Sequence, residues 1–166
     1  MRTLELIPVN HSLAVRLAAG EQVEPFADQA VPPLVQEVAT AQAALYERTG
    51  AAPPWIGYLA RDPEAGIIVG SCSFKDEPHE GQVEIAYFTF PDHERQGYGL
   101  AMAQALVEIA FADPAVTHVL GHTLPERNAS ARILSHLGFE FAGPVSDPED
   151  GTVWKWLLKR PTSGSD

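Results

Sequence analysis

Residues 95–99 of the chain read Arg-Gln-Gly-Tyr-Gly, and their types and spacing suit the binding of an anion. A β-branched and aromatic segment, 83–90, comes before them, and an apolar segment of helical composition, 100–111, follows. When a strand runs through a short glycine loop into a helix, the first N–H groups of that helix lack partners and attract phosphates. The sequence therefore predicts a site for a phosphorylated ligand at this loop.

Two common phosphate-binding patterns do not match this stretch. Residues 97–102 read Gly-Tyr-Gly-Leu-Ala-Met and lack the third glycine of the dinucleotide-binding pattern. No segment fits the Gly-x4-Gly-Lys-Ser/Thr pattern of nucleotide-binding loops. Nicotinamide, flavin and ATP are therefore poorly supported as ligands.

The order of the elements around this loop predicts a mixed sheet. Strands are predicted at 3–9, 55–60, 67–74, 83–90, 117–120, 139–142 and 152–158, and helices at 12–19, 34–47, 100–111 and 128–137. Three successive antiparallel strands followed by a strand–helix–strand crossover indicate an α/β (α+β) fold with helices on the faces of the sheet. Residues 1–160 are expected to form one domain, and residues 161–166 a flexible tail.

The composition disfavours several classes of partner. The chain has 22 acidic and 11 basic residues, and its net charge of −11 disfavours nucleic acid and anionic membrane surfaces but is compatible with a cationic amine. There is no run of 18 apolar residues, and the first residues lack the apolar core of a signal peptide. The single cysteine, Cys72, excludes an internal disulfide and fits a cytoplasmic location.

The loop resembles the signature of the GCN5-related N-acetyltransferases, Gln/Arg-x-x-Gly-x-Gly/Ala, whose amides wrap the pyrophosphate of acetyl-coenzyme A. Residues 94–99 here read Glu-Arg-Gln-Gly-Tyr-Gly, so that Glu94 stands where Gln or Arg is usual. A carboxylate is unhelpful beside a pyrophosphate, and Glu94 is expected to turn to solvent. Arg95 is expected to supply the positive charge.

A second block strengthens the resemblance. Residues 122–130 read His-Thr-Leu-Pro-Glu-Arg-Asn-Ala-Ser, and residues 137–139 read Leu-Gly-Phe. Both are similar to the branch of the family that acetylates the N-termini of ribosomal proteins, and Trp154-Lys155-Trp156 near the end of the chain also fits. The resemblance implies a single-domain fold of about six to seven strands and about four helices. It also implies acetyl-coenzyme A, an amine acceptor and direct transfer without a metal.

The resemblance places the coenzyme along the strand and the loop. In this family the pantetheine arm lies beside the strand as a pseudo-strand, and a backbone N–H near Phe88 would polarise the thioester carbonyl. Asn128 is expected to contact the coenzyme, although it also suits the cap of a helix. The coenzyme-binding residues expected from the resemblance are Phe88, Thr89, Phe90, Arg95, Gln96, Gly97, Tyr98, Gly99, Leu100, Asn128 and Ser130.

Glu84 is the predicted catalytic base, acting directly or through water, because many members of the family carry a carboxylate hereabouts. The alternative interpretation is a glutamate on a solvated strand face. Many relatives also carry a tyrosine four residues before the Gly-Phe pair, but this chain has Leu134 there. Coenzyme A is a thiol and can leave without a general acid.

Other signals are set aside. His118 and His122 have the spacing of a metal pair on a helix, but their segment reads as a strand and a turn.

The predicted activity is acetyl-coenzyme A-dependent N-acetylation of a primary amine, either a protein N-terminus or a small molecule. A non-catalytic acetyl-coenzyme A-binding module is the alternative, and a domain without any ligand is a weaker one. A homodimer is the default for the family.

Overall fold

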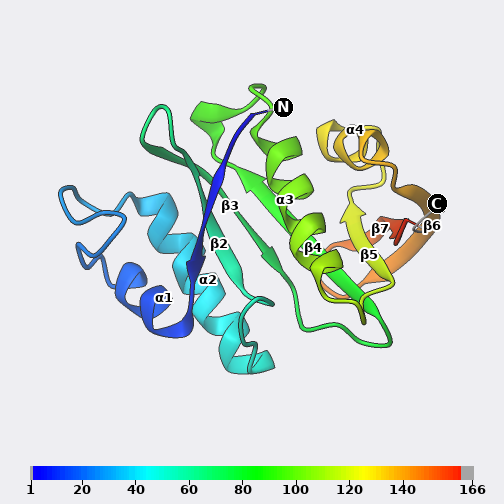
Figure 1. Cartoon of the computed structure of the whole chain (residues 1–166), viewed down its shortest axis with the longest axis horizontal. Helices are drawn as coiled ribbons and strands as arrows, with labels where there is room; N and C mark the ends of the chain where they lie inside the picture. The colour runs from blue at the N-terminus through cyan, green and yellow to red at the C-terminus, as the bar shows by residue number, and fades with distance from the viewer. Residues whose placement is uncertain (1, 162–166) are drawn as a thin grey trace.

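The computed structural model describes residues 2–161, and a seven-stranded sheet forms its centre (Figure 1). The strands are β1 (Glu5–Val9), β2 (Gly57–Asp62), β3 (Ile67–Phe74), β4 (Gln82–Thr89), β5 (His118–Thr123), β6 (Glu140–Asp147) and β7 (Gly151–Lys159). Their order in the sheet is β1-β2-β3-β4-β5-β7-β6, and every neighbouring pair is antiparallel except β4 and β5. The predicted mixed, mostly antiparallel sheet is confirmed.

Four helices cover the two faces of this sheet. They are α1 (His11–Ala18), α2 (Pro33–Thr49), α3 (Tyr98–Ala112) and α4 (Ala129–His136), and a short 3-10 turn, η1 (Pro91–His93), follows β4. A Cβ added to Gly57 would point at Gln42 of α2, whereas one added to Gly70 would point at Met102 of α3. Gly57 pairs with Ser73, an odd number of residues from Gly70 on β3, so α2 and α3 lie on opposite faces.

Most predicted boundaries agree with the structure to within two residues, but one strand is much longer than expected. The strand predicted at 139–142 continues to Asp147 as β6, although it contains Gly143 and Pro144. It is an edge strand with a register shift between Phe141 and Gly143, and edge strands with bulges tolerate glycine and proline. The predicted tail lies almost wholly outside the described residues.

The feature that shapes the candidate site is the separation of β4 from β5. The two strands pair only from Gln82 to Glu84 on β4 and from His118 to Leu120 on β5. Beyond this point no further pairing joins them, while β5 continues to pair with β7 as far as Thr123. The end of β4 therefore has an open edge on the β5 side.

Within residues 2–161, no helix has the length and apolar character needed to cross a membrane.

Candidate active site

The glycine loop presents unpaired amides at the start of α3, as predicted. Gly97 has φ of +87° and Arg95 has φ of +64°, and these two left-handed residues turn the chain into the helix. The N–H of Ala101 donates to the carbonyl of Gly97 at 3.2 Å, so helical bonding starts at residue 101. The amides of residues 98–100 consequently have no partner within the helix and can bind an anion.

A groove of about 710 Å³ runs between this loop and α4. Gly99 allows the close approach of its two walls, because a Cβ added there would lie 2.9 Å from Cδ1 of Ile133. The charged side chains on the groove are Glu94, Arg95 and Arg132, together with His136. Glu94 is exposed, as expected, but it also lines the groove.

The structure gathers most of the predicted coenzyme residues on this groove. Those that line it are Phe88, Thr89, Arg95, Gly97, Tyr98, Gly99, Leu100 and Ser130. Three others lie elsewhere. Phe90 lines a separate cavity with Phe26. The side chain of Asn128 caps α4 by accepting the N–H of Ala131 at 2.9 Å, and it lines a second cavity.

Gln96 is the third predicted coenzyme residue that does not line the groove, and it belongs to a network of contacts that holds the loop. Its carbonyl accepts a hydrogen bond from Nε of Arg2 at 2.9 Å, and the Arg2 guanidinium stacks on the ring of Tyr98. The Tyr98 hydroxyl donates to Oδ2 of the buried Asp62 at 2.6 Å. This hydrogen bond is the main reason why the pKa of Asp62 is lowered and the pKa of Tyr98 is raised. The side chain of Tyr98 therefore fixes the loop.

The backbone of β4 presents alternate residues to the open edge. The N–H of Phe90 donates to Val69, and the N–H of Lys75 donates to the carbonyl of Glu84, so even-numbered residues of β4 face β3. The N–H of Phe88 belongs to this set and is used within the sheet. The N–H groups of Tyr87 and Thr89 face the open edge instead. The predicted polarising N–H near Phe88 is thus better matched by these two neighbours.

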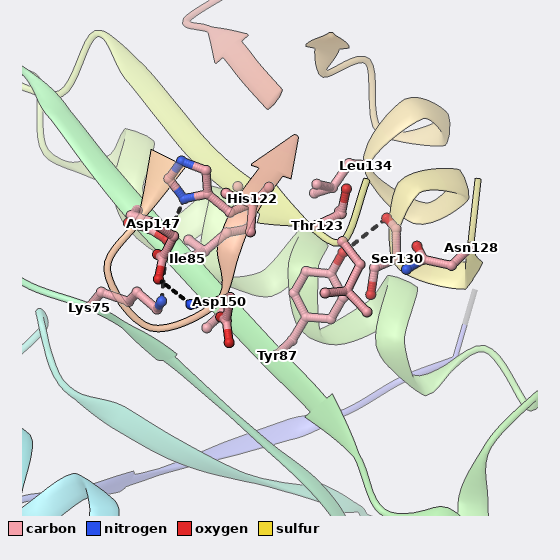
Figure 2. Close-up of a pocket in the computed structure, with 15 residues that line it drawn as sticks. Lys75, Ile85, Tyr87, His122, Thr123, Asn128, Ser130, Leu134, Asp147 and Asp150 are labelled. Atoms are coloured by element: carbon pink, nitrogen blue, oxygen red, sulfur yellow. Dashed lines mark hydrogen bonds and ion pairs between the residues drawn. The ribbon is translucent and has the colours of Figure 1, made fainter. Parts of the chain in front are cut away.

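A second cavity, of about 280 Å³, lies where β4 and β5 separate (Figure 2). Its central feature is a short contact between β4 and β5, in which Nδ1 of His122 lies 2.7 Å from Oε2 of Glu84. Nζ of Lys75 lies 3.5 Å from the same oxygen. Because an ionised carboxylate only accepts hydrogen bonds, Nδ1 carries the proton. Nε2 of the neutral ring is then a proton acceptor, and it has no partner among residues 2–161.

Glu84 is the predicted base, whereas no sequence pattern indicates a catalytic role for His122. Glu84 pairs with Leu120 in the parallel register, and His122 lies two residues further along β5 on the same face. Their side chains are 24% and 23% exposed, so both are sheltered but remain open to a ligand. Glu84 is thus a partly exposed residue of β4, and its role as the catalytic base stays a prediction.

The β6–β7 hairpin adds acidic side chains to the second cavity. Asp147 and Asp150 line it (Figure 2). Oδ1 of Asp147 accepts the N–H groups of Glu149 and Asp150, at 2.8 and 2.9 Å, and these bonds lower the pKa of Asp147. The charge of the nearby Lys75 lowers it further, as does His122 when its ring is protonated. The cavity thus carries fixed negative charge beside the Glu84–His122 pair.

Tyr87 and Ser130 line both cavities and therefore mark where the two meet. The Tyr87 hydroxyl donates to the carbonyl of Ser130 at 3.3 Å, and burial raises the pKa of this phenol to about 12. Leu134, at the position where many relatives carry tyrosine, is buried against Gly121 and lines the second cavity. No phenol of α4 reaches this place.

Metal ligands and a reactive thiol are not part of this arrangement. Among residues 2–161, no three His, Cys, Asp or Glu side chains come together in a way that could hold a metal ion. Cys72 is buried, and burial raises the pKa of its thiol. The residues present instead offer an anion-binding groove, an open strand edge and a carboxylate–imidazole pair.

A family model and several known proteins match this chain. The model of the acetyltransferase (GNAT) domain matches residues 4–140. The uncharacterized N-acetyltransferase YjdG of Bacillus subtilis is 33% identical over 73 residues, which is 43% of this chain. The matched stretch spans only 44% of that relative's length.

Solved structures share the fold over almost the whole chain. RimL, a ribosomal L7/L12 alpha-N-protein acetyltransferase in complex with coenzyme A, superposes with a TM-score of 0.66 at 18% identity and covers 96% of this chain and 95% of its own. The aminoglycoside acetyltransferase AAC(6')-Ib in complex with coenzyme A gives a TM-score of 0.63 at 22% identity, with 95% of each chain covered. At these identities the likeness shows the fold.

Proposed function

Because the chain belongs to the acetyltransferase (GNAT) family, we propose that it transfers the acetyl group of acetyl-coenzyme A directly to a primary amine where β4 and β5 separate. The observation that carries the proposal is the Glu84–His122 pair, with its 2.7 Å contact, in a cavity that meets the coenzyme groove at Tyr87. Acetyl transfer to an amine requires a site that holds the coenzyme and a group that takes the proton of the amine. The groove supplies the first as an anion site, and the second cavity supplies the other as a proton acceptor.

The fit of acetyl-coenzyme A to the groove is supported by residues of this chain. The amides of residues 98–100 and the Arg95 guanidinium suit the pyrophosphate. The open edge of β4, at Tyr87 and Thr89, suits the amide groups of a pantetheine arm, which can bond to it as an added strand does. When bound, the coenzyme supplies the activated acetyl thioester.

The backbone at the open edge orients and polarises the reacting carbonyl. An N–H group that is fixed in a strand needs no reorganisation when charge develops on the oxygen, and one such donor contributes roughly 3–4 kcal/mol. The N–H groups of Tyr87 and Thr89 are the candidates, because they face away from β3. Holding the amine beside the thioester supplies the other large contribution.

The Glu84–His122 pair removes the proton from the amine. An amine reaches the cavity mainly as a cation and must lose a proton before its lone pair can attack. Nε2 of His122 receives that proton, while Glu84 holds the imidazole in the required tautomer and balances the charge that forms. Glu84 thus acts through His122, in a role more specific than that of a single carboxylate base.

The acceptor is a cation that the second cavity can hold. Glu84, Asp147 and Asp150 face it with only Lys75 as a fixed cation, which favours an ammonium group over an anion. Protein N-termini and small amines both meet this description. RimL and AAC(6')-Ib, named for a protein and for aminoglycosides respectively, represent these two classes.

The test is acetyl transfer from acetyl-coenzyme A to a panel of peptides with free N-termini, polyamines and aminoglycosides, with the products read by mass. The proposal predicts at least one acceptor that gains one acetyl group as coenzyme A is released. The matched control is His122→Asn, which should bind acetyl-coenzyme A normally and form little product.

A second candidate function is a non-catalytic acetyl-coenzyme A-binding module. The observation in its favour is Leu134, which leaves the second cavity without a phenol from α4 that could act as a general acid. Burial raises the pKa of the nearby Tyr87 phenol to about 12. Coenzyme binding without an acetylated product from any amine in the panel would support this module. A thermal-shift experiment separates both from a domain without a ligand, because a ligand that binds only the folded state raises the unfolding temperature.

A further inference from the structure

Two arginines and a histidine line the coenzyme groove. The chain has a net charge of −11, and Arg2, Arg16 and Arg61 each pair with an acidic side chain. Arg95 and Arg132 are among the arginines that form no ion pair with a carboxylate in residues 2–161, and Nη1 of Arg132 donates to the carbonyl of Arg127 at 3.5 Å. Two guanidinium groups without a carboxylate partner on one groove of an acidic protein indicate a site for negative charge.

The two arginines lie on different walls of the groove. Arg95 belongs to the loop before α3, and Arg132 belongs to α4. His136 is one turn beyond Arg132 on the same side of α4 and lines the same groove. Ile133 packs beside Gly99, so the α4 cations lie close to the N-terminus of α3. The groove therefore has two cationic points, one on each wall.

The two cations of α4 lie on the side of the helix that faces away from the second cavity. Ser130 and Leu134 line that cavity. Arg132 comes two residues after Ser130, and His136 comes two residues after Leu134. Two residues correspond to about 200° around a helix, so the cations are on nearly the opposite side of α4 from Leu134. A bound anion at Arg132 is consequently far from the Glu84–His122 pair.

We propose that Arg132 and His136 bind the 3′-phosphate of coenzyme A, so that the protein discriminates coenzyme A from its 3′-dephospho form. This inference rests on the proposed function. The amides of residues 98–100 and Arg95 accommodate the pyrophosphate, the open edge of β4 accommodates the pantetheine arm, and the 3′-phosphate is the remaining dianionic group of the ligand. The bidentate guanidinium of Arg132 matches its geometry, and His136 adds a ring N–H donor.

The test is calorimetric titration of the full chain with coenzyme A and with 3′-dephospho-coenzyme A. The wild type is expected to bind coenzyme A about tenfold more tightly. Arg132→Gln should reduce this ratio to about twofold by weakening coenzyme A alone, and His136→Gln should reduce it less. Arg48→Gln, an exposed arginine of α2, is the matched control and should leave the ratio unchanged.

Each other outcome overturns the inference. Equal affinity of the wild type for the two ligands shows that the 3′-phosphate is not recognised, while the proposed function stands. Equal weakening of both ligands by Arg132→Gln assigns this arginine to the pyrophosphate. If neither ligand binds the wild type, both the inference and the proposed function fail.

Discussion

Removal of either member of the Glu84–His122 pair should slow acetyl transfer, and removal of both should slow it no further. Glu84→Gln keeps the size of the side chain but removes the charge that holds Nδ1–H of His122, and His122→Asn removes the proton acceptor. Proton transfer by a positioned side chain is worth about 10²- to 10⁴-fold in rate, which corresponds to roughly 2.7–5.4 kcal/mol.

The structure predicts strong coupling because the two groups share one proton across 2.7 Å. Once Glu84 is lost, the imidazole is no longer held, so that losing His122 as well adds little. The double variant should therefore retain about the rate of the slower single variant. If the two residues acted independently, the losses would multiply to roughly 10⁴- to 10⁸-fold.

The assay is kcat/KM for an acceptor found in the amine panel, measured at saturating acetyl-coenzyme A for all four members of the cycle. Coenzyme affinity should change less than about twofold, because neither side chain lines the coenzyme groove. His118→Asn is the matched control, since His118 is on the same strand but has no carboxylate contact among residues 2–161. If the two losses multiply, or if either single variant keeps a near-normal rate, Glu84 and His122 do not act as one acid–base pair.

Three further predictions concern the loop. Glu94→Gln removes a carboxylate from the groove and should tighten acetyl-coenzyme A binding by about two- to fivefold at low salt, with a smaller gain at high salt in calorimetry. Tyr98→Phe removes the main cause of the lowered pKa of Asp62. A carboxyl with a lowered pKa in the folded state stabilises the protein above its unfolded pKa and loses that contribution as pH falls through the folded value. The urea midpoint of Tyr98→Phe should therefore be lower at neutral pH, and its difference from the wild type should shrink as pH falls below about 4. Gly99→Ala brings a Cβ within 2.9 Å of Cδ1 of Ile133 and should cost about 1–3 kcal/mol of unfolding free energy. Ile133→Val deletes that methyl group, so the double variant should lose less than the sum of the singles in urea titrations. Additive losses would show that the two residues do not share this contact.

The loop and the element order could be predicted because their signals are local. Residues 95–99 contain Gly97, which suits the left-handed φ of the turn, and Gly99, which allows the close approach of Ile133. The predicted strand at 67–74 coincides with β3, Ile67–Phe74. Phe88 lines the groove whereas Phe90 lies in the cavity with Phe26, although period-two alternation places both on one face, so this pattern does not separate them.

The acid–base pair could not be predicted because it depends on contacts distant in sequence. Glu84 and His122 are 38 residues apart, and they meet only through the register of two parallel strands that pair over three residues. No pattern in either segment determines where β4 and β5 separate. The contributions of Asp147 and Lys75 depend likewise on how the β6–β7 hairpin and the β3–β4 connection lie over the sheet.

Amide hydrogen exchange with and without acetyl-coenzyme A tests the position of the ligand directly. Exchange should slow at the amides of residues 97–100 and of Tyr87 and Thr89, with no comparable change around Phe26 and Phe90. Slowed exchange confined to the cavity at Phe26 and Phe90, or no change at saturating ligand, would contradict the assignment of the groove to acetyl-coenzyme A.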